Sequence, residues 1–173
     1  MNKEISKVKM LVADAVIAVA LLVFDQFTKY LAIEKLKGNA PYVLIEGVLE
    51  LDYLENRGSA FGMFQNQKVF ILLVGIVFML FLLFLLWKLP EQKKFCIMHI
   101  LLAVIIAGGV GNMIDRFRFS FVVDFISFVL INYPIFNVAD IYVVLATIGL
   151  FIVFLFVFKE SDLQFLSFRR KDT

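Results

Sequence analysis

Two carboxylates bound an almost wholly apolar stretch in the C-terminal half of the sequence. The stretch VVDFISFVLINYPIFNVAD, residues 122–140, has Asp124 near its start and Asp140 at its end. An unpaired carboxylate is costly in apolar surroundings, so both need shared polar partners. Two carboxyl groups held close together cannot both ionise, and one keeps its proton. The charged group can then activate water while the protonated one polarises a peptide carbonyl, which hydrolyses an amide without metal or covalent intermediate.

Each aspartate also has a purely structural explanation. Asp140 lies in the first turn of a predicted helix, where a carboxylate satisfies free N–H groups. Asn137 is the better N-cap, with Asp140 three residues later as the acid of a capping box. Asp124 could be a solvated residue that turns the chain. The sequence leaves catalysis and structure open for both.

Other polar side chains recur at helical spacing near the ends of predicted helices. Asn112, Asp115 and Arg116 share one face, where a guanidinium could tune charge or donate to a carbonyl. A simple helix-end salt bridge is the alternative for Asp115. Asp25 and Lys29 repeat the spacing; Lys29 could merely extend its amine to the membrane surface, with Asp25 as its partner.

Other catalytic chemistries lack a complete set of residues. Cys96 and His99 are one helical turn apart but have no third orienting group. A serine peptidase would need a base beside its serine, and the single histidine is predicted on the opposite side of the membrane. One histidine and no HExxH motif argue against a zinc peptidase, so no metal and no cofactor are expected.

The composition is that of a membrane protein. Hydrophobic residues make up 62% of the 173 residues and charged residues 18%, against about one-half and one-quarter in soluble domains. The net charge of +2 gives no reason to expect a nucleic-acid partner. The length predicts a single membrane-embedded domain over residues 1–173.

Four apolar runs of about 20 residues are long enough to cross a hydrocarbon core as helices. They cover residues 10–33, 69–87, 96–114 and 138–158. The first run resembles a signal peptide, but it continues past the AVA at 18–20 and Asp14 interrupts it. An uncleaved span is therefore predicted.

The distribution of lysine and arginine predicts the orientation of the chain. Ten of these residues lie in the N-terminal tail, the 88–95 loop and the C-terminal tail, and six lie on the other side over longer loops. Both termini are therefore predicted to be cytoplasmic, with segments 34–68 and 115–137 extracytoplasmic. The first segment alternates apolar and acidic residues, which predicts short strands and a turn. The second is too apolar for a free loop and is predicted to lie on the membrane surface or over the helix ends.

Two other functional classes fit parts of this pattern. A proton- or ion-coupled transporter would use Asp14, Asp25 and Asp140 as a relay, which requires carboxylates spread through the membrane depth. A scaffold could assemble other membrane proteins through the small residues of GGVG at 108–111. The scaffold leaves Asp124 without a role.

Five motifs resemble the bacterial lipoprotein signal peptidase (signal peptidase II) family in order and spacing. They are DQFTK (25–29), NRGSAFG (56–62), GGVGNMIDR (108–116), VVDF (122–125) and FNVAD (136–140). The resemblance implies an all-α polytopic membrane protein with four transmembrane helices, a small extracytoplasmic β-cradle and a membrane-surface helical segment.

The same resemblance implies an aspartic endopeptidase of the bacterial cytoplasmic membrane. It implies a catalytic pair of Asp124 and Asp140, with an active site near the extracytoplasmic face. The implied substrate is a prolipoprotein cut just before a cysteine that already carries diacylglycerol, and the other expected partner is membrane lipid; a monomer is expected. Matching positions that support the site or touch substrate are Asp25, Asn56, Asn112, Asp115, Arg116 and Asn137.

Two positions depart from the family's pattern. Ser120 stands where a glycine is usual shortly before VVDF, and Ile141 stands where a small or polar residue follows FNxAD. These departures concern the local turn and the packing behind the pair. Asp14 matches no family role.

Overall fold

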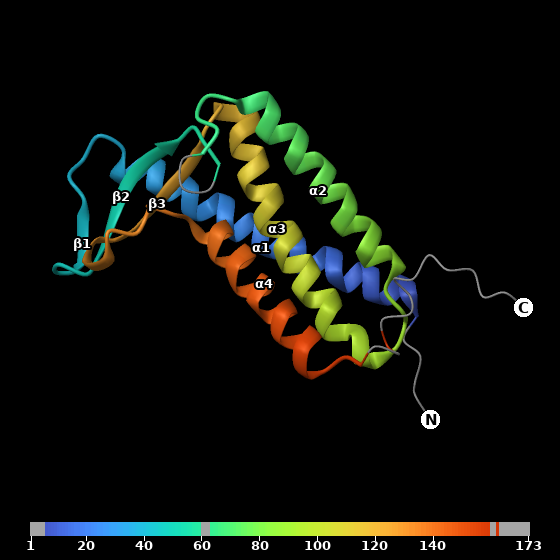
Figure 1. The fold of residues 1–173 in the computed structure, drawn as a ribbon. Helices are drawn as coiled ribbons and strands as arrows, with labels where there is room; N and C mark the ends of the chain where they lie inside the picture. Colours follow the sequence, from blue (N-terminus) through green and yellow to red (C-terminus); the bar gives the residue numbers. More distant parts are fainter. Residues whose placement is uncertain (1–5, 60–62, 160–161, 163–173) are drawn as a thin grey trace, which may run out of the picture.

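The computed structural model describes residues 6–59, 63–159 and 162 as four long helices, a small sheet and two 3₁₀ turns. In chain order these are α1 (Lys7–Leu36), β1 (Tyr42–Ile45), β2 (Leu49–Asn56), α2 (Lys68–Lys88), η2 (Lys93–Phe95), α3 (Cys96–Phe119), β3 (Val122–Phe128), η3 (Val129–Ile131) and α4 (Val138–Phe156). The helices lie side by side with the sheet at one end, and α1 begins and α4 ends at the opposite end (Figure 1).

Helix α3 is the centre of the bundle and packs against α1, α2 and α4. Its glycines allow close approach: a Cβ at Gly108 would lie 2.5 Å from the Ala139 carbonyl oxygen and 2.9 Å from Val143 Cγ2. Small residues at helix contacts are typical of membrane bundles, where packing rather than water drives association. The main apolar core lies between α2, α3 and α4, around Leu82, Leu102, Ile105, Ala146 and Val153.

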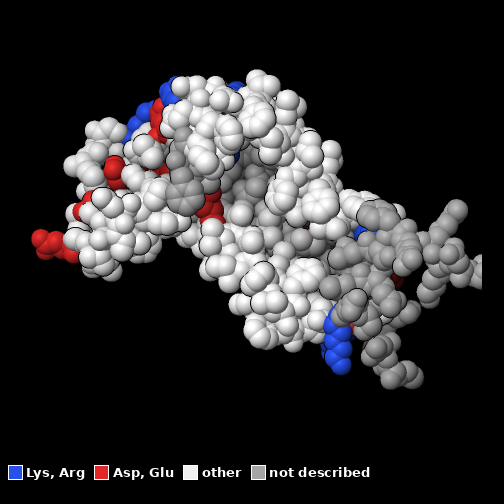
Figure 2. Space-filling view, in the orientation of Figure 1, with Lys and Arg blue, Asp and Glu red and all other residues white. Residues whose placement is uncertain are grey.

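Within the described part of the chain, three helical segments are long and apolar enough to cross a membrane: Lys68–Lys88, Lys93–Phe119 and Val138–Phe156. The first of these ends two residues before Pro90, which cannot continue a helix. Figure 2 shows that the visible helix surface is almost entirely uncharged, with Lys, Arg, Asp and Glu gathered mainly at the sheet end and at the opposite end. The predicted membrane class is therefore supported.

The sheet has the order β1-β2-β3 with antiparallel neighbours. Its first two strands arise from the segment whose alternating residues predicted strands, so that prediction is confirmed. In the register of β2 and β3, Leu54 lies opposite Asp124 and Asn56 opposite Val122. This pairing places the side chains of Asn56 and Asp124 at the end of the sheet nearest the helices.

The second outer segment packs over the helix ends, which is one of its two predicted positions. Residues 115–119 continue α3, and Val122–Phe128 form β3, which packs against α1 and α3. A strand is favoured because β2 satisfies its backbone N–H and C=O groups. The segment continues after β3 with the three-residue turn η3.

Ser120 forms the turn that joins α3 to β3. It has a φ of 69°, in the left-handed region that favours glycine. Its amide donates to the Arg116 carbonyl at 3.1 Å, and its hydroxyl accepts a hydrogen bond from Lys68 at 2.9 Å. The turn therefore forms with serine in the place of the family's glycine.

Replacing Gly108 with alanine should lower the midpoint of thermal unfolding, because the new methyl group would meet the α4 backbone. Overpacking of this kind costs about 1–3 kcal/mol. The matched control is Gly75→Ala in α2, whose Cβ would lie at an ordinary 3.4 Å from Met113 Sδ. Unfolding of purified protein in detergent measures both variants, and equal midpoints would contradict the close packing of α3 on α4.

Candidate active site

Both predicted catalytic aspartates are held by amide hydrogen bonds at the sheet end of the bundle. Asp124, on β3, accepts from Asn137 Nδ2 at 2.6 Å and from Asn56 Nδ2 at 2.9 Å. Asp140, in the first turn of α4, accepts from Asn112 Nδ2 at 2.8 Å and from the Asn137 backbone N–H at 3.1 Å. Every carboxylate oxygen of the pair thus has a defined donor.

Asn112 and Asn137 join the two aspartates into one network. Asn137 Nδ2 also donates to Asn112 Oδ1 at 3.1 Å, and Asn137 Oδ1 accepts from the Asp140 backbone N–H at 3.0 Å. The second contact completes the predicted capping box at the start of α4. Asp140 therefore caps a helix and belongs to the network at the same time.

The environment of Asp124 favours its protonated form. Its exposed fraction is 1%, so the alternative of a solvated turn residue is wrong. Burial, and after it the charge of Asp140, raise the pKa of Asp124 to about 7, although the amides of Asn56 and Asn137 act in the opposite direction. A proton on one carboxyl is what a close pair requires.

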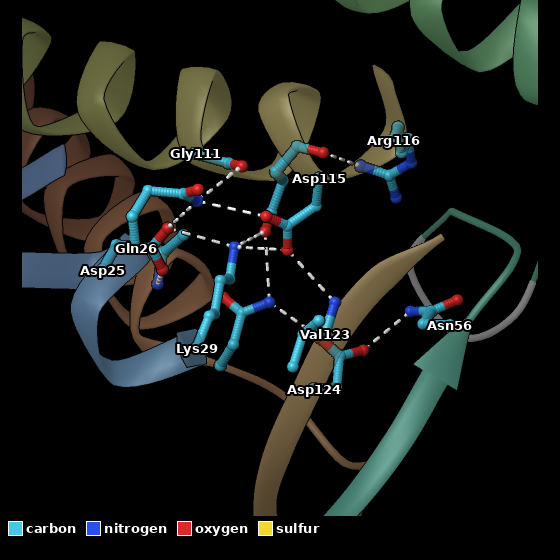
Figure 3. A network of polar contacts seen from close by, with 12 residues as sticks. Asp25, Gln26, Lys29, Asn56, Gly111, Asp115, Arg116, Val123 and Asp124 are labelled. Carbon is cyan, nitrogen blue, oxygen red and sulfur yellow. Dashed lines mark hydrogen bonds and ion pairs between the residues drawn. The ribbon is translucent and has the colours of Figure 1, made fainter. Parts of the chain in front are cut away.

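The buried ammonium group of Lys29 lies next to Asp25 and Asp115 (Figure 3). Lys29 Nζ lies 3.1 Å from Asp25 Oδ2 and 3.1 Å from Asp115 Oδ2, and it donates to Asn112 Oδ1 at 2.9 Å. Its side chain is 3% exposed, so the alternative in which it extends to the membrane surface is wrong. Asp115 likewise pairs with a residue of another helix and forms no simple helix-end bridge.

The two acids beside Lys29 also accept hydrogen bonds from the backbone next to Asp124 and Asp140. Asp25 Oδ1 accepts from the Ala139 N–H at 3.1 Å, one residue before Asp140. Asp115 Oδ2 accepts from the Val123 N–H at 3.1 Å, one residue before Asp124. One cation on α1 is thereby linked to both segments that carry the pair.

Gln26 completes this polar cluster, although it was not among the predicted site residues. Its amide nitrogen lies 3.2 Å from Asp25 Oδ2, 3.1 Å from Asp115 Oδ1 and 3.3 Å from the Gly111 carbonyl oxygen. Its position next to Asp25 in DQFTK is the only sequence signal for it.

Arg116 is in the predicted region but contacts backbone rather than carboxylates. Its Nη2 donates to the Gly58 carbonyl at 2.8 Å and its Nη1 to the Asn112 carbonyl at 3.3 Å. Asn56 Oδ1 accepts from the Gly58 N–H at 3.0 Å, so the loop after β2 is held from two directions. The rest of the NRGSAFG motif, residues 60–62, lies outside the described residues.

Asp14 lies near the other end of α1 and has a buried partner that was not predicted from the sequence. The Asp14 carboxylate is 2.7 Å from His99 Nδ1, and both side chains are buried. His99 is thus paired with an acid on α1 and not with Cys96. The two groups are far from the aspartate pair along their helices and do not belong to its network.

Ile141, the second departure from the family's pattern, is half-buried in the first turns of α4. Its backbone N–H donates to the Asn137 carbonyl at 3.3 Å, as regular helix geometry requires. The larger side chain leaves the capping box intact.

Comparison with known proteins agrees with these features. The family model for signal peptidase (SPase) II matches residues 17–157. Similar relatives include a lipoprotein signal peptidase of Caldanaerobacter subterraneus subsp. tengcongensis, 42% identical over 84% of this chain and 97% of the relative. Another, from Clostridium tetani, is 37% identical over 87% of this chain and 96% of the relative.

Two solved structures described as bacterial membrane enzymes have the same fold. One, determined at 2.3 Å resolution, has a TM-score of 0.79 and 27% identity over 98% of each chain. The other, at 1.9 Å, has a TM-score of 0.75 and 28% identity over 91% of this chain and 99% of its own. Since the family model and the relatives match most of the sequence, this chain belongs to the signal peptidase II family.

Proposed function

We propose that this protein is an aspartic endopeptidase that removes signal peptides from diacylglyceryl-modified prolipoproteins, cutting before the lipidated cysteine. The observation that carries the proposal is the joining of Asp124 and Asp140 through Asn112 and Asn137. The names of the relatives, lipoprotein signal peptidases, support the substrate class.

The buried Asp124 holds the proton in the resting enzyme, and the more exposed Asp140 carries the charge. Asp140 takes a proton from water as the water oxygen attacks the scissile carbonyl carbon, and Asp124 gives its proton to the carbonyl oxygen. The tetrahedral intermediate then collapses. Asp140 protonates the leaving amine as the C–N bond breaks, and Asp124 recovers its proton as the new carboxyl group forms.

The remaining site residues fix this geometry. Asn112 and Asn137 orient the aspartates, Asn56 holds Asp124, and Arg116 holds the loop carbonyl of Gly58. Asp25 and Asp115 hold the backbone beside each aspartate. Pre-organisation of this kind lets the catalytic groups act without rearrangement.

The chain forms a single domain embedded in the bacterial cytoplasmic membrane, and α1 crosses the membrane as a fourth span. An ionisable group in a span is costly unless it is paired inside the bundle. Asp14 is paired with His99, and Asp25 and Lys29 are paired with each other. The lysine and arginine asymmetry supports cytoplasmic termini, with the sheet and the aspartates toward the extracytoplasmic face. The enzyme acts as a monomer.

Asp124→Asn and Asp140→Asn should each abolish cleavage of a diacylglyceryl-cysteine lipobox peptide while leaving folded protein in the membrane. Asparagine keeps the shape of the side chain but cannot exchange the proton. Because both groups act in one step, the double variant should lose no more than either single variant. Adding EDTA to the wild-type enzyme should change nothing; substantial cleavage by Asp140→Asn, or chelator sensitivity, would contradict the mechanism.

The pH dependence of kcat/KM should be bell-shaped, with a fall in activity as pH rises through about 7. The sign follows from Asp124, whose raised pKa keeps it protonated, and active as the acid, below about 7. Above this value it becomes a second carboxylate. The acidic limb reflects protonation of the pair's remaining charge, so both limbs belong to the pair. Activity that rises steadily between pH 7 and 9 would refute this assignment.

Lys29→Met should destabilise the protein by about 3–5 kcal/mol, since it leaves buried acids without their cation. In protein that remains folded at low temperature, the alkaline limb should move to higher pH, because the charge of Lys29 lowers the pKa of Asp124. The matched control is Lys37→Met, which removes an exposed pair with Glu55 and should change little. If the alkaline limb of the pH profile stays at the same pH in Lys29→Met, Lys29 contributes to stability and has no effect on the pKa of Asp124.

A further inference from the structure

A groove of about 530 Å³ lies between α2 and α3 near the sheet end of the bundle. Its volume is in the range of roughly 300–1,000 Å³ that is usual for small-molecule sites. Apart from one arginine its lining is apolar: Val69, Leu72, Leu73, Ile76, Met79, Val110, Met113, Ile114, Phe117 and Arg118. At 3.6 residues per turn, Val110 and Ile114 lie on the side of α3 opposite Asn112, so the groove does not open on the aspartate pair.

Two cations mark the outer end of this groove. Lys68, the first residue of α2, donates to the Phe117 carbonyl at 3.4 Å and to the Ser120 hydroxyl at 2.9 Å, so its ammonium lies at the last turn of α3. Arg118, on that turn, is exposed, with its guanidinium 4.9 Å from the centre of the Phe119 ring. Neither cation forms an ion pair with any residue that the structure describes.

The start of α2 adds to the positive character of this end. No side chain among the described residues caps its N-terminus, and no acidic residue lies in its first turn. The free N–H groups of a helix N-terminus favour an anion. An apolar groove with positive charge only at its outer end matches a lipid, with a chain along the walls and a phosphate at the cations.

We propose that this groove binds an anionic phospholipid of the surrounding membrane, with one acyl chain between α2 and α3 and the phosphate at Lys68 and Arg118. An anionic lipid is favoured over a zwitterionic one because no acidic side chain lines the groove to receive an ammonium head group. The lipid is distinct from the proposed substrate, whose diacylglyceryl group carries no phosphate and whose scissile bond must reach the other side of α3.

Native mass spectrometry of the purified full-length protein tests the site with phosphatidylglycerol and phosphatidylcholine of identical acyl chains. Phosphatidylglycerol should occupy one saturable site about tenfold more tightly than phosphatidylcholine. Both cations attract the net negative charge of its head group, whereas the head group of phosphatidylcholine has no net charge. Lys68→Gln/Arg118→Gln should remove that preference. The control Lys35→Gln/Lys37→Gln removes the same charge at the same end of the molecule, away from the groove, and should keep the preference.

A second variant tests the groove itself and leaves the cations in place. Ile76 is 44% exposed, so Ile76→Trp should fold and fill the groove, which lowers occupancy by phosphatidylglycerol. Equal binding of the two lipids to the wild type would overturn the proposal. So would a loss of the phosphatidylglycerol preference in Lys35→Gln/Lys37→Gln as large as that in Lys68→Gln/Arg118→Gln. Displacement of phosphatidylglycerol by a diacylglyceryl-cysteine peptide would also overturn it, because the groove would then belong to the substrate.

Discussion

The buried contact of Lys29 with Asp25 and Asp115 is the interaction on which the rest of the site depends. A lone ammonium or carboxylate would be prohibitively costly here, and each is accepted only because the others and several N–H groups surround it. One positive and two negative charges leave an excess of negative charge, which the N–H groups of Val123 and Ala139 partly neutralise. The starts of β3 and α4 are therefore fixed by the charges of α1 and α3.

The same cluster explains the glycine at position 111. A Cβ at Gly111 would collide with Asp25 Oδ2, so α1 can bring its acid to α3 only where the side chain is missing. Gln26 donates to the Gly111 carbonyl at the same place and ties the two acids together. Close helix packing and charge burial are thus a single arrangement at this level of the bundle.

Asparagine side chains are suited to connect this cluster with Asp124 and Asp140, because an amide group both donates and accepts hydrogen bonds. Lys29 donates to Asn112 Oδ1, which orients the Asn112 NH₂ group toward Asp140. Asn137 donates to Asp124 with its side chain and to Asp140 with its backbone. The two carboxyls therefore lie in different surroundings, one buried on a strand and one half-buried in the first turn of a helix, and the proposed mechanism uses this difference to separate the acid from the base.

Much of the fold follows from local patterns in the sequence. Apolar runs predict the helices, the alternation in residues 42–56 predicts β1 and β2, and the spacing of Asn137 and Asp140 predicts the capping box. Strand β3 could not be predicted in this way, because Val122–Phe125 are buried on both faces and show no alternation. The pairing of Asp14 with His99 and of Lys29 with Asp115 depends on helix packing between distant residues, which spacing alone does not encode.

Titration of the Asp124 carboxyl tests the coupling of the two aspartates most directly. Carbon-13 NMR of labelled protein in detergent, compared between the wild type and Asp140→Asn, follows this group alone. The structure predicts a pKa of about 7 in the wild type, and a lower pKa, still above 3.8, when the charge of Asp140 is removed. A wild-type value near 3.8, or the same value in both proteins, would contradict a coupled pair.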